Sequence, residues 1–110
     1  MAGWPRSFSY AIGQWRLKRR IRRDSIRIAR EINPTLWENV RRKVASSSEK
    51  ELMAYAKARA AQLCHERIDV MMQADATLSG DFATQLLVKS TDRAIQLVRQ
   101  ALVSARRSAA

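Results

Sequence analysis

The sequence predicts an all-α fold, a small helical bundle formed by a single domain of residues 1–110. Apolar residues recur at steps of three and four along most of the chain, as on one face of a helix, and no stretch keeps the alternation of a β-strand. Ser/Thr-x-x-Glu patterns at residues 35–38 and 48–51 mark helix starts. We therefore expect a basic N-terminal helix, a short connecting helix and a long antiparallel pair of C-terminal helices.

The first helix is predicted to span about residues 6–32. Near its N-terminus one face carries Phe8, Ile12 and Trp15. A different face, suited to packing against the rest of the protein, carries Leu17, Ile21, Ile28 and Ile32. Asn33 and Pro34 should end this helix, because proline has no N–H group and disfavours helical geometry in the residue before it.

The remaining helices follow from their caps and turns. A short helix should run from Thr35 to about Ala45 and stop at three consecutive serines, 46–48. A long helix should then run to about Leu78, and the turn at 79–81, with Asp81 as its N-cap, should start the last helix, about 82–106. Because that turn is short, residues 48–107 should form an antiparallel hairpin.

Positive charge is concentrated in the N-terminal half. The formal net charge is +11; residues 1–50 contain 13 basic and 4 acidic residues, whereas residues 51–110 contain 8 and 6. Five of the seven aromatic residues also lie in this half, within residues 1–45. Such asymmetry favours a polyanionic partner for the basic half of the chain.

Arginines form a stripe along the first predicted helix, because they follow one another at steps of three and four. The arginine side chain binds phosphate through its planar fork of donors. The sequence therefore predicts a non-enzymatic protein that binds DNA or RNA through the phosphate backbone, largely without sequence specificity. The predicted nucleic-acid-binding residues are Arg16, Arg19, Arg20, Arg23, Arg27, Arg30, Arg41, Arg42 and Lys43.

A second interpretation is a structural or adaptor subunit whose basic helix binds acidic protein surface; a third is that the arginines are simply solvated. The aromatic residues Trp4, Phe8 and Trp15 are the predicted partner-docking residues, and they are also candidates for stacking on unpaired bases. We expect Trp15 and Trp37 to pack between helices. Self-association is expected as well, because the last helix has apolar residues away from its main stripe, at Val88, Ile95 and Val103.

The sequence contains no convincing catalytic, metal or cofactor motif. His65, Glu66 and Asp69 depart from the zinc pattern His-Glu-x-x-His, and the chain has one histidine. A helix-turn-helix ending in the helix after Ser48 is a weak alternative, because that helix begins with Glu49 and Glu51. We therefore expect no enzyme activity, no metal and no cofactor.

The compartment is predicted from cysteine content and hydropathy. The single cysteine, Cys64, cannot form an internal disulfide, which favours a reducing, cytoplasmic environment. No apolar run approaches the roughly 20 residues that span a bilayer, so we expect no membrane partner. The first 23 residues contain no acid, which is also typical of organelle transit peptides, so organelle import is a second expectation.

Overall fold

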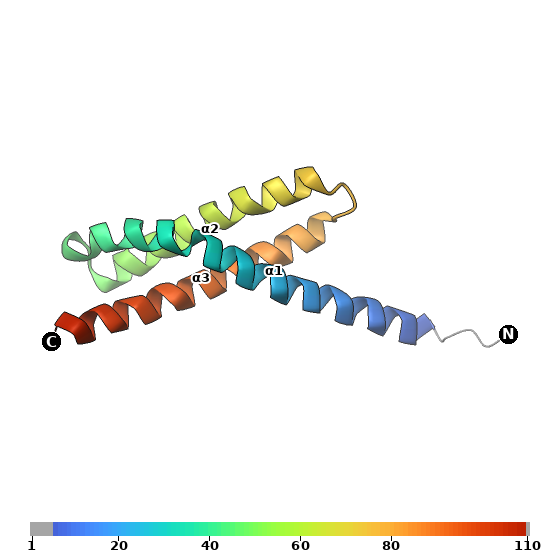
Figure 1. Ribbon diagram of the computed structural model, residues 1–110, viewed down its shortest axis with the longest axis horizontal. Helices are drawn as coiled ribbons and strands as arrows, with labels where there is room; N and C mark the ends of the chain where they lie inside the picture. The colour runs from blue at the N-terminus through green and yellow to red at the C-terminus, as the bar shows by residue number, and fades with distance from the viewer. Residues whose placement is uncertain (1–5, 110) are drawn as a thin grey trace.

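The computed structural model describes residues 6–109, with side chains from residue 10 onward, and over that range it is helical without a β-strand. Its elements are α1 (Arg6–Lys43), the 3₁₀-helix η1 (Val44–Ser46), α2 (Glu49–Ala74) and α3 (Gly80–Ala109). The all-α prediction is confirmed. The α2 and α3 helices form the expected antiparallel pair, and α1 crosses α3 and then runs alongside α2 (Figure 1).

The predicted end of the first helix at Asn33 and Pro34 is wrong. Helix α1 continues through Pro34 to Lys43, so the short connecting helix is the last part of α1. The physical reason is burial on both sides of the proline: Ile32 is 2% exposed, and Leu36 is fully buried. Burying such side chains contributes about 1.5–3 kcal/mol each, which offsets the cost of about 3 kcal/mol for a proline inside a helix.

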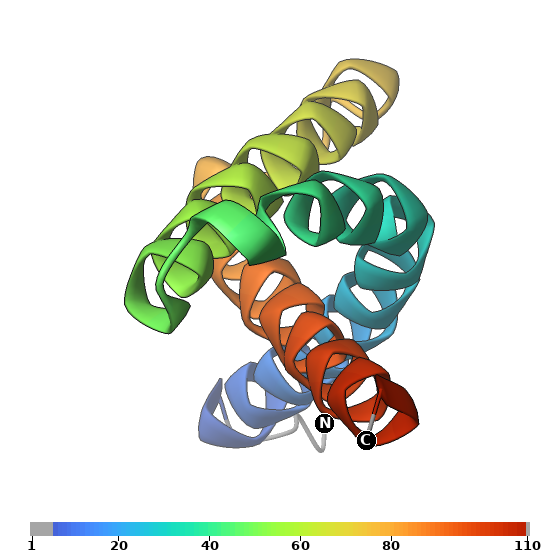
Figure 2. The same ribbon diagram turned by 90° about the vertical axis from the view of Figure 1, so that its left-hand side faces the viewer.

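Proline nevertheless shapes the helix. Pro34 is exposed, and α1 changes direction in the teal segment that contains residues in the thirties (Figure 2). A bend with the proline on the outer side lets the buried face of α1 follow the rest of the bundle. That face includes Ile28, Ile32, Leu36 and Val40.

Serine side chains cap the N-termini of α2 and α3. Ser48 accepts a hydrogen bond from the backbone N–H of Glu51 at 3.2 Å and donates to the Glu51 carboxylate at 2.9 Å, so this capping prediction is confirmed. The predicted end of the next helix at Leu78 is wrong, because α2 stops at Ala74 and Asp75 accepts a hydrogen bond from Thr77 N–H at 3.0 Å. The N-cap of α3 is Ser79 and not Asp81: its hydroxyl accepts from Phe82 N–H at 3.1 Å.

The core lies where α3 packs against both other helices. Fully buried side chains come from all three: Leu36 and Val40 of α1, Cys64 of α2, and Leu86 and Val98 of α3. On the last helix, Val88 and Val103 are exposed as predicted. Ile95 is 8% exposed and therefore belongs to the core, which corrects the prediction that it forms part of an outer apolar strip.

The molecule is elongated because α1 is longer than the bundle. Its radius of gyration is 17.9 Å, against about 13 Å for a compact domain of 100 residues. The first turns of α1 extend beyond the turn between α2 and α3 (Figure 1), and Tyr10, Ile12 and Trp15 are exposed there. We call residues 10–20 of α1 the arm.

Candidate nucleic-acid interface

The outward face of the arm and of the next turns of α1 carries a dense set of arginines around a tryptophan. An open hollow of about 770 Å³ is lined by Trp15, Arg16, Arg19, Arg20, Arg22, Arg23 and Ile26. Among the described side chains, no carboxylate lines it. The Trp15 side chain is 59% exposed, and the Arg19 guanidinium carbon lies 5.3 Å from the centre of its ring. An aromatic ring and several guanidinium groups are therefore presented together to solvent.

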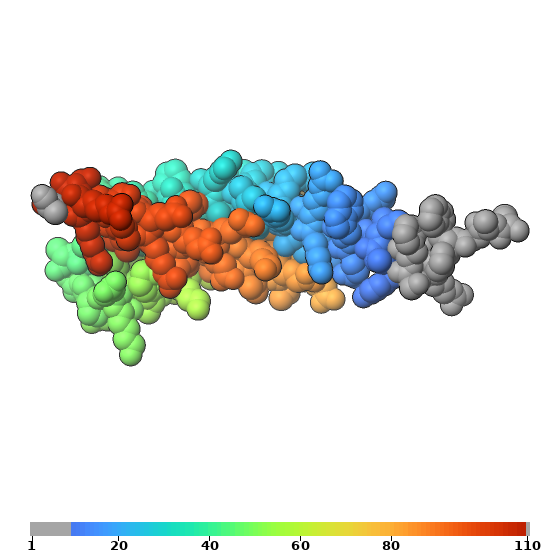
Figure 3. Space-filling view, turned by 90° about the horizontal axis from the view of Figure 1, so that it is seen from below, coloured from blue at the N-terminus to red at the C-terminus, as the bar shows by residue number. Residues whose placement is uncertain are grey.

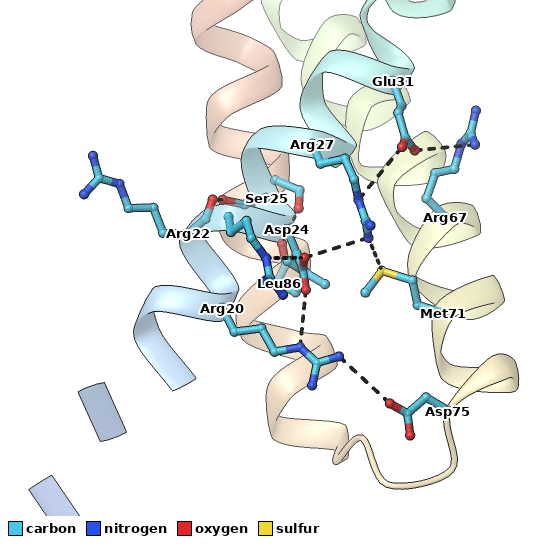
Figure 4. A network of polar contacts seen from close by, with 12 residues as sticks. Arg20, Arg22, Asp24, Ser25, Arg27, Glu31, Arg67, Met71, Asp75 and Leu86 are labelled. Carbon is cyan, nitrogen blue, oxygen red and sulfur yellow. Dashed lines mark hydrogen bonds and ion pairs between the residues drawn. The ribbon is translucent and has the colours of Figure 1, made fainter. Parts of the chain in front are cut away.

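The inner edge of the arginine stripe is held by one buried carboxylate. Asp24 is 3% exposed, and its oxygens lie 3.5 Å from Arg20 Nε, 3.5 Å from Arg23 Nε and 3.8 Å from an Arg27 Nη (Figure 4). A buried carboxylate needs compensating positive charge, and these arginines supply it. Part of the positive charge of the stripe is therefore neutralised within the protein.

Arg20 and Arg27 also connect α1 to other elements. Arg20 lies 3.9 Å from Asp75 in the turn between α2 and α3, and its guanidinium carbon is 5.1 Å from the centre of the Phe82 ring. Arg27 lies 3.9 Å from Glu31 and donates to the sulfur of Met71 at 3.6 Å. These two arginines have structural partners on the side of α1 that faces the bundle.

Hydrogen bonds within the turn between α2 and α3 lower the pKa of Asp75. Bonds from the Thr77 hydroxyl and backbone N–H, together with the charge of Arg20, hold the pKa of the Asp75 carboxyl below its usual range. The carboxylate that faces Arg20 is therefore kept in its charged form.

Arg16, Arg19 and Arg30 differ from these residues, because their guanidinium groups form no ion pair with any described side chain. Arg16 and Arg19 line the large hollow, and Arg30 lines a second hollow between α1 and α3. Arg23 is intermediate: it is paired with Asp24, yet its side chain remains 74% exposed. The predicted stripe on α1 consists of Arg16, Arg19, Arg20, Arg23, Arg27 and Arg30. Its outward charge is carried mainly by four of these six residues, Arg16, Arg19, Arg23 and Arg30.

Three comparisons with known proteins give no relative of this chain. Comparison with models of protein families, with curated protein sequences and with solved structures found nothing similar. The functional argument therefore depends on the geometry and chemistry of this surface.

The second predicted basic cluster lies beyond Pro34, at the other end of α1, and is partly neutralised. Glu38 accepts hydrogen bonds from Arg41 at 2.9 Å and from Arg42 at 3.2 Å. The bond from Arg41 is the main cause of a lowered pKa for the Glu38 carboxyl. Lys43 lies over the ring of Tyr55, 4.6 Å from its centre. All three cations therefore have partners within the protein.

The predicted docking aromatics are only partly described. Trp4 lies outside the described residues, and Phe8 belongs to α1 but its side chain is outside them. Trp15 is exposed, so the prediction that it packs between helices is wrong; the ring lies in the outward hollow, which is lined by residues of α1. Trp37 is half-buried against the core, as predicted.

The structure adds a basic groove that sequence analysis missed. Between α1 and α3 a hollow of about 330 Å³ is lined by Lys18, Ile21, Arg22, Ser25, Gln85, Lys89 and Arg93. Lys89 and Arg93 are four residues apart on one face of α3, which is a weak sequence signal. Their proximity to Lys18 and Arg22 depends on how α1 crosses α3.

The candidate motifs for other chemistry are ordinary surface and core features. His65 Nδ1 lies 3.2 Å from Asp69 on an exposed face of α2, and within residues 6–109 no group of His, Cys, Asp and Glu could hold a metal ion. Cys64 is fully buried, and burial raises the pKa of its thiol to about 11. Over the same residues, no helix is apolar for long enough to cross a bilayer.

Proposed function

We propose that this protein is a non-enzymatic nucleic-acid-binding protein that contacts the phosphate backbone through the outward face of α1. The observation that carries the proposal is the hollow in which exposed Trp15 is surrounded by arginines without a lining carboxylate. Guanidinium groups neutralise phosphates and release counterions, while an exposed ring can stack on an unpaired base. The pairing of these two groups on one helix face favours nucleic acid over a purely acidic protein partner.

The length of this face suits several phosphates. Residues 16 to 30 of a helix span about 21 Å at 1.5 Å per residue. Duplex DNA carries one charge per roughly 1.7 Å of its axis, so about 12 phosphates occur over that length. Arg16, Arg19 and Arg30 have no ion-pair partner among the described residues that would orient them toward a particular base edge, so binding should depend on charge and shape more than on sequence.

The test uses the three arginines that have no ion pair among the described residues. We expect the triple variant R16Q/R19Q/R30Q to bind labelled duplex DNA or structured RNA more weakly. Its slope of log affinity against log salt should be smaller by about 3, because each lost phosphate contact on duplex DNA removes roughly 0.9. The matched control, K50Q/K57Q/R107Q, removes the same net charge from exposed positions outside this face and should retain most of the slope.

The results separate this proposal from its main alternative. If both triple variants weaken binding equally, the α1 face is not the site. If the native chain binds neither ligand at about 0.1 M salt, where exposed charges are already partly screened, the basic face belongs to an adaptor that binds acidic protein surface.

A further inference from the structure

We propose that the groove between α1 and α3 is a separate phosphate-binding site, formed by Lys18, Arg22, Lys89 and Arg93. Helices α1 and α3 lie side by side on the face shown in Figure 3, and the four cations line one hollow of about 330 Å³ between them. Among the described residues, no carboxylate lines this hollow. Four like charges brought together repel one another, so the groove favours an anion as occupant.

One of the four cations is held in place by a buried hydroxyl. Arg93 Nε donates to Ser25 Oγ at 3.0 Å, and Ser25 Oγ donates to the backbone carbonyl of Arg22 at 2.9 Å. Ser25 is fully buried, so this hydrogen-bonded pair lies at the base of the groove. The Nε bond uses one of the five N–H groups of Arg93 and fixes the plane of its guanidinium, leaving its other donors for a ligand. Such pre-orientation lowers the entropy lost when an anion binds.

Arg22 connects this groove to the outward face of α1. It lines both the groove and the large hollow that contains Trp15. Its side chain points away from the Asp24 network, on the other side of α1 from Arg20 and Arg27 (Figure 4). Beyond Arg93 the groove continues into a hollow of about 220 Å³ lined in part by Arg30. A backbone bound on the outward face can therefore place another phosphate in the groove.

Asp92 of α3 borders the site. Asp92 lines a neighbouring hollow with Lys89, Arg93 and Gln96, but it does not line the groove. Its negative charge opposes a bound phosphate, so the variant D92N should bind phosphate more tightly than the native chain.

The claim that the bound phosphate belongs to a nucleic acid rests on the proposed function. The claim that the groove binds phosphate does not. The test therefore has two parts, both on the full chain. Inorganic phosphate is titrated at constant ionic strength while backbone amide resonances are followed by NMR. Duplex DNA binding is then measured across a salt series. The variant is K18Q/K89Q, and the matched control is K50Q/K57Q; all four lysines are exposed, so neither pair should disturb the fold.

We expect phosphate to shift the amide resonances of Ser25 and Gln85 in the native chain and the control, but not in K18Q/K89Q. The DNA salt slope should fall by about 2 in K18Q/K89Q only, because two phosphate contacts are lost. If phosphate gives no selective shift at the groove, or if K18Q/K89Q retains the native slope, the proposal is overturned while the function of the outward face stands. If phosphate shifts these resonances but the chain binds no DNA or RNA, the groove is a phosphate site for a free phosphorylated compound, and the proposed function fails.

Discussion

The guanidinium group of Arg20 lies over the ring of Phe82, 5.1 Å from its centre, and joins α1 to the first turn of α3. The same side chain lies near Asp24 and Asp75. Phe82 is 2% exposed and belongs to the hydrophobic core, so Arg20 packs directly against a core residue. A residue that its spacing places in a nucleic-acid-binding stripe thus has a clear structural role.

Replacing Arg20 should therefore reduce stability. We expect R20M to lower the free energy of unfolding by about 1–2 kcal/mol, because it removes one cation–π contact, one ion pair with the buried Asp24 and one with the partly exposed Asp75. Urea denaturation followed by circular dichroism measures this change. The control R16M alters an exposed arginine of the arm that forms no ion pair with a described side chain, and it should change stability by less than about 0.5 kcal/mol. Equal effects of the two variants would show that the contact with Phe82 contributes little.

The buried carboxylate of Asp24 should be the most sensitive polar group. The variant D24N leaves three arginines without their shared counter-charge, and we expect a loss of about 2 kcal/mol in the free energy of unfolding. D92N removes an exposed carboxylate from α3 and serves as the control, with an expected change below about 0.5 kcal/mol. Thermal and urea unfolding measure the change in the free energy of unfolding for each variant. A D24N protein as stable as D92N would mean that the three ion pairs do not hold α1 in place.

The exposed ring of Trp15 should contribute to binding and not to folding. We expect W15A to lose about 1–3 kcal/mol of binding free energy for a single-stranded oligonucleotide, because base stacking on the ring is lost. The control is Y10A, since Tyr10 is also exposed but lies about 140° around the same helix. Fluorescence anisotropy compares the two. If Y10A weakens binding as much as W15A, no particular face of the arm is used.

The thiol of Cys64 should be protected until the protein unfolds. Because burial raises its pKa to about 11, we expect the folded chain to react very slowly with a thiol reagent at pH 8, and to react readily in urea. Fast labelling of the native protein would contradict the packing of α2 against α3.

The same pKa shift predicts a pH dependence of stability. In the unfolded chain the thiol loses its proton near pH 9, whereas in the folded protein it stays protonated until about pH 11. Between these values the unfolded state binds fewer protons, so the contribution of Cys64 to stability is present below pH 9 and is lost as the pH rises towards 11. Between pH 8 and 11, the free energy of unfolding measured from denaturation curves should decline less for C64A than for the native chain.

Local patterns in the sequence suffice to predict the all-α class, the antiparallel hairpin and the capping of α2 by Ser48, because helix periodicity and capping act over a few residues. They also place the six arginines of the stripe on one side of α1, whereas Arg22 lies on another side. They fail at Pro34, where the burial of Leu36 outweighs the local preference of proline to end a helix. They fail again at Trp15, which is exposed because it lies on the outward face of α1, in a hollow lined by α1 residues.

The division of the arginines into structural and outward-facing groups is a result of packing. Helical spacing gives Arg20, Arg27 and Arg30 equal places in the stripe, and nothing in it indicates that Asp75, Phe82 and Met71 lie beside the first two. The groove between α1 and α3 likewise brings Lys18 close to Lys89, residues far apart in the chain. Such contacts depend on where α1 crosses α3. That crossing is set by the shape of the whole buried core and not by the residues near each arginine.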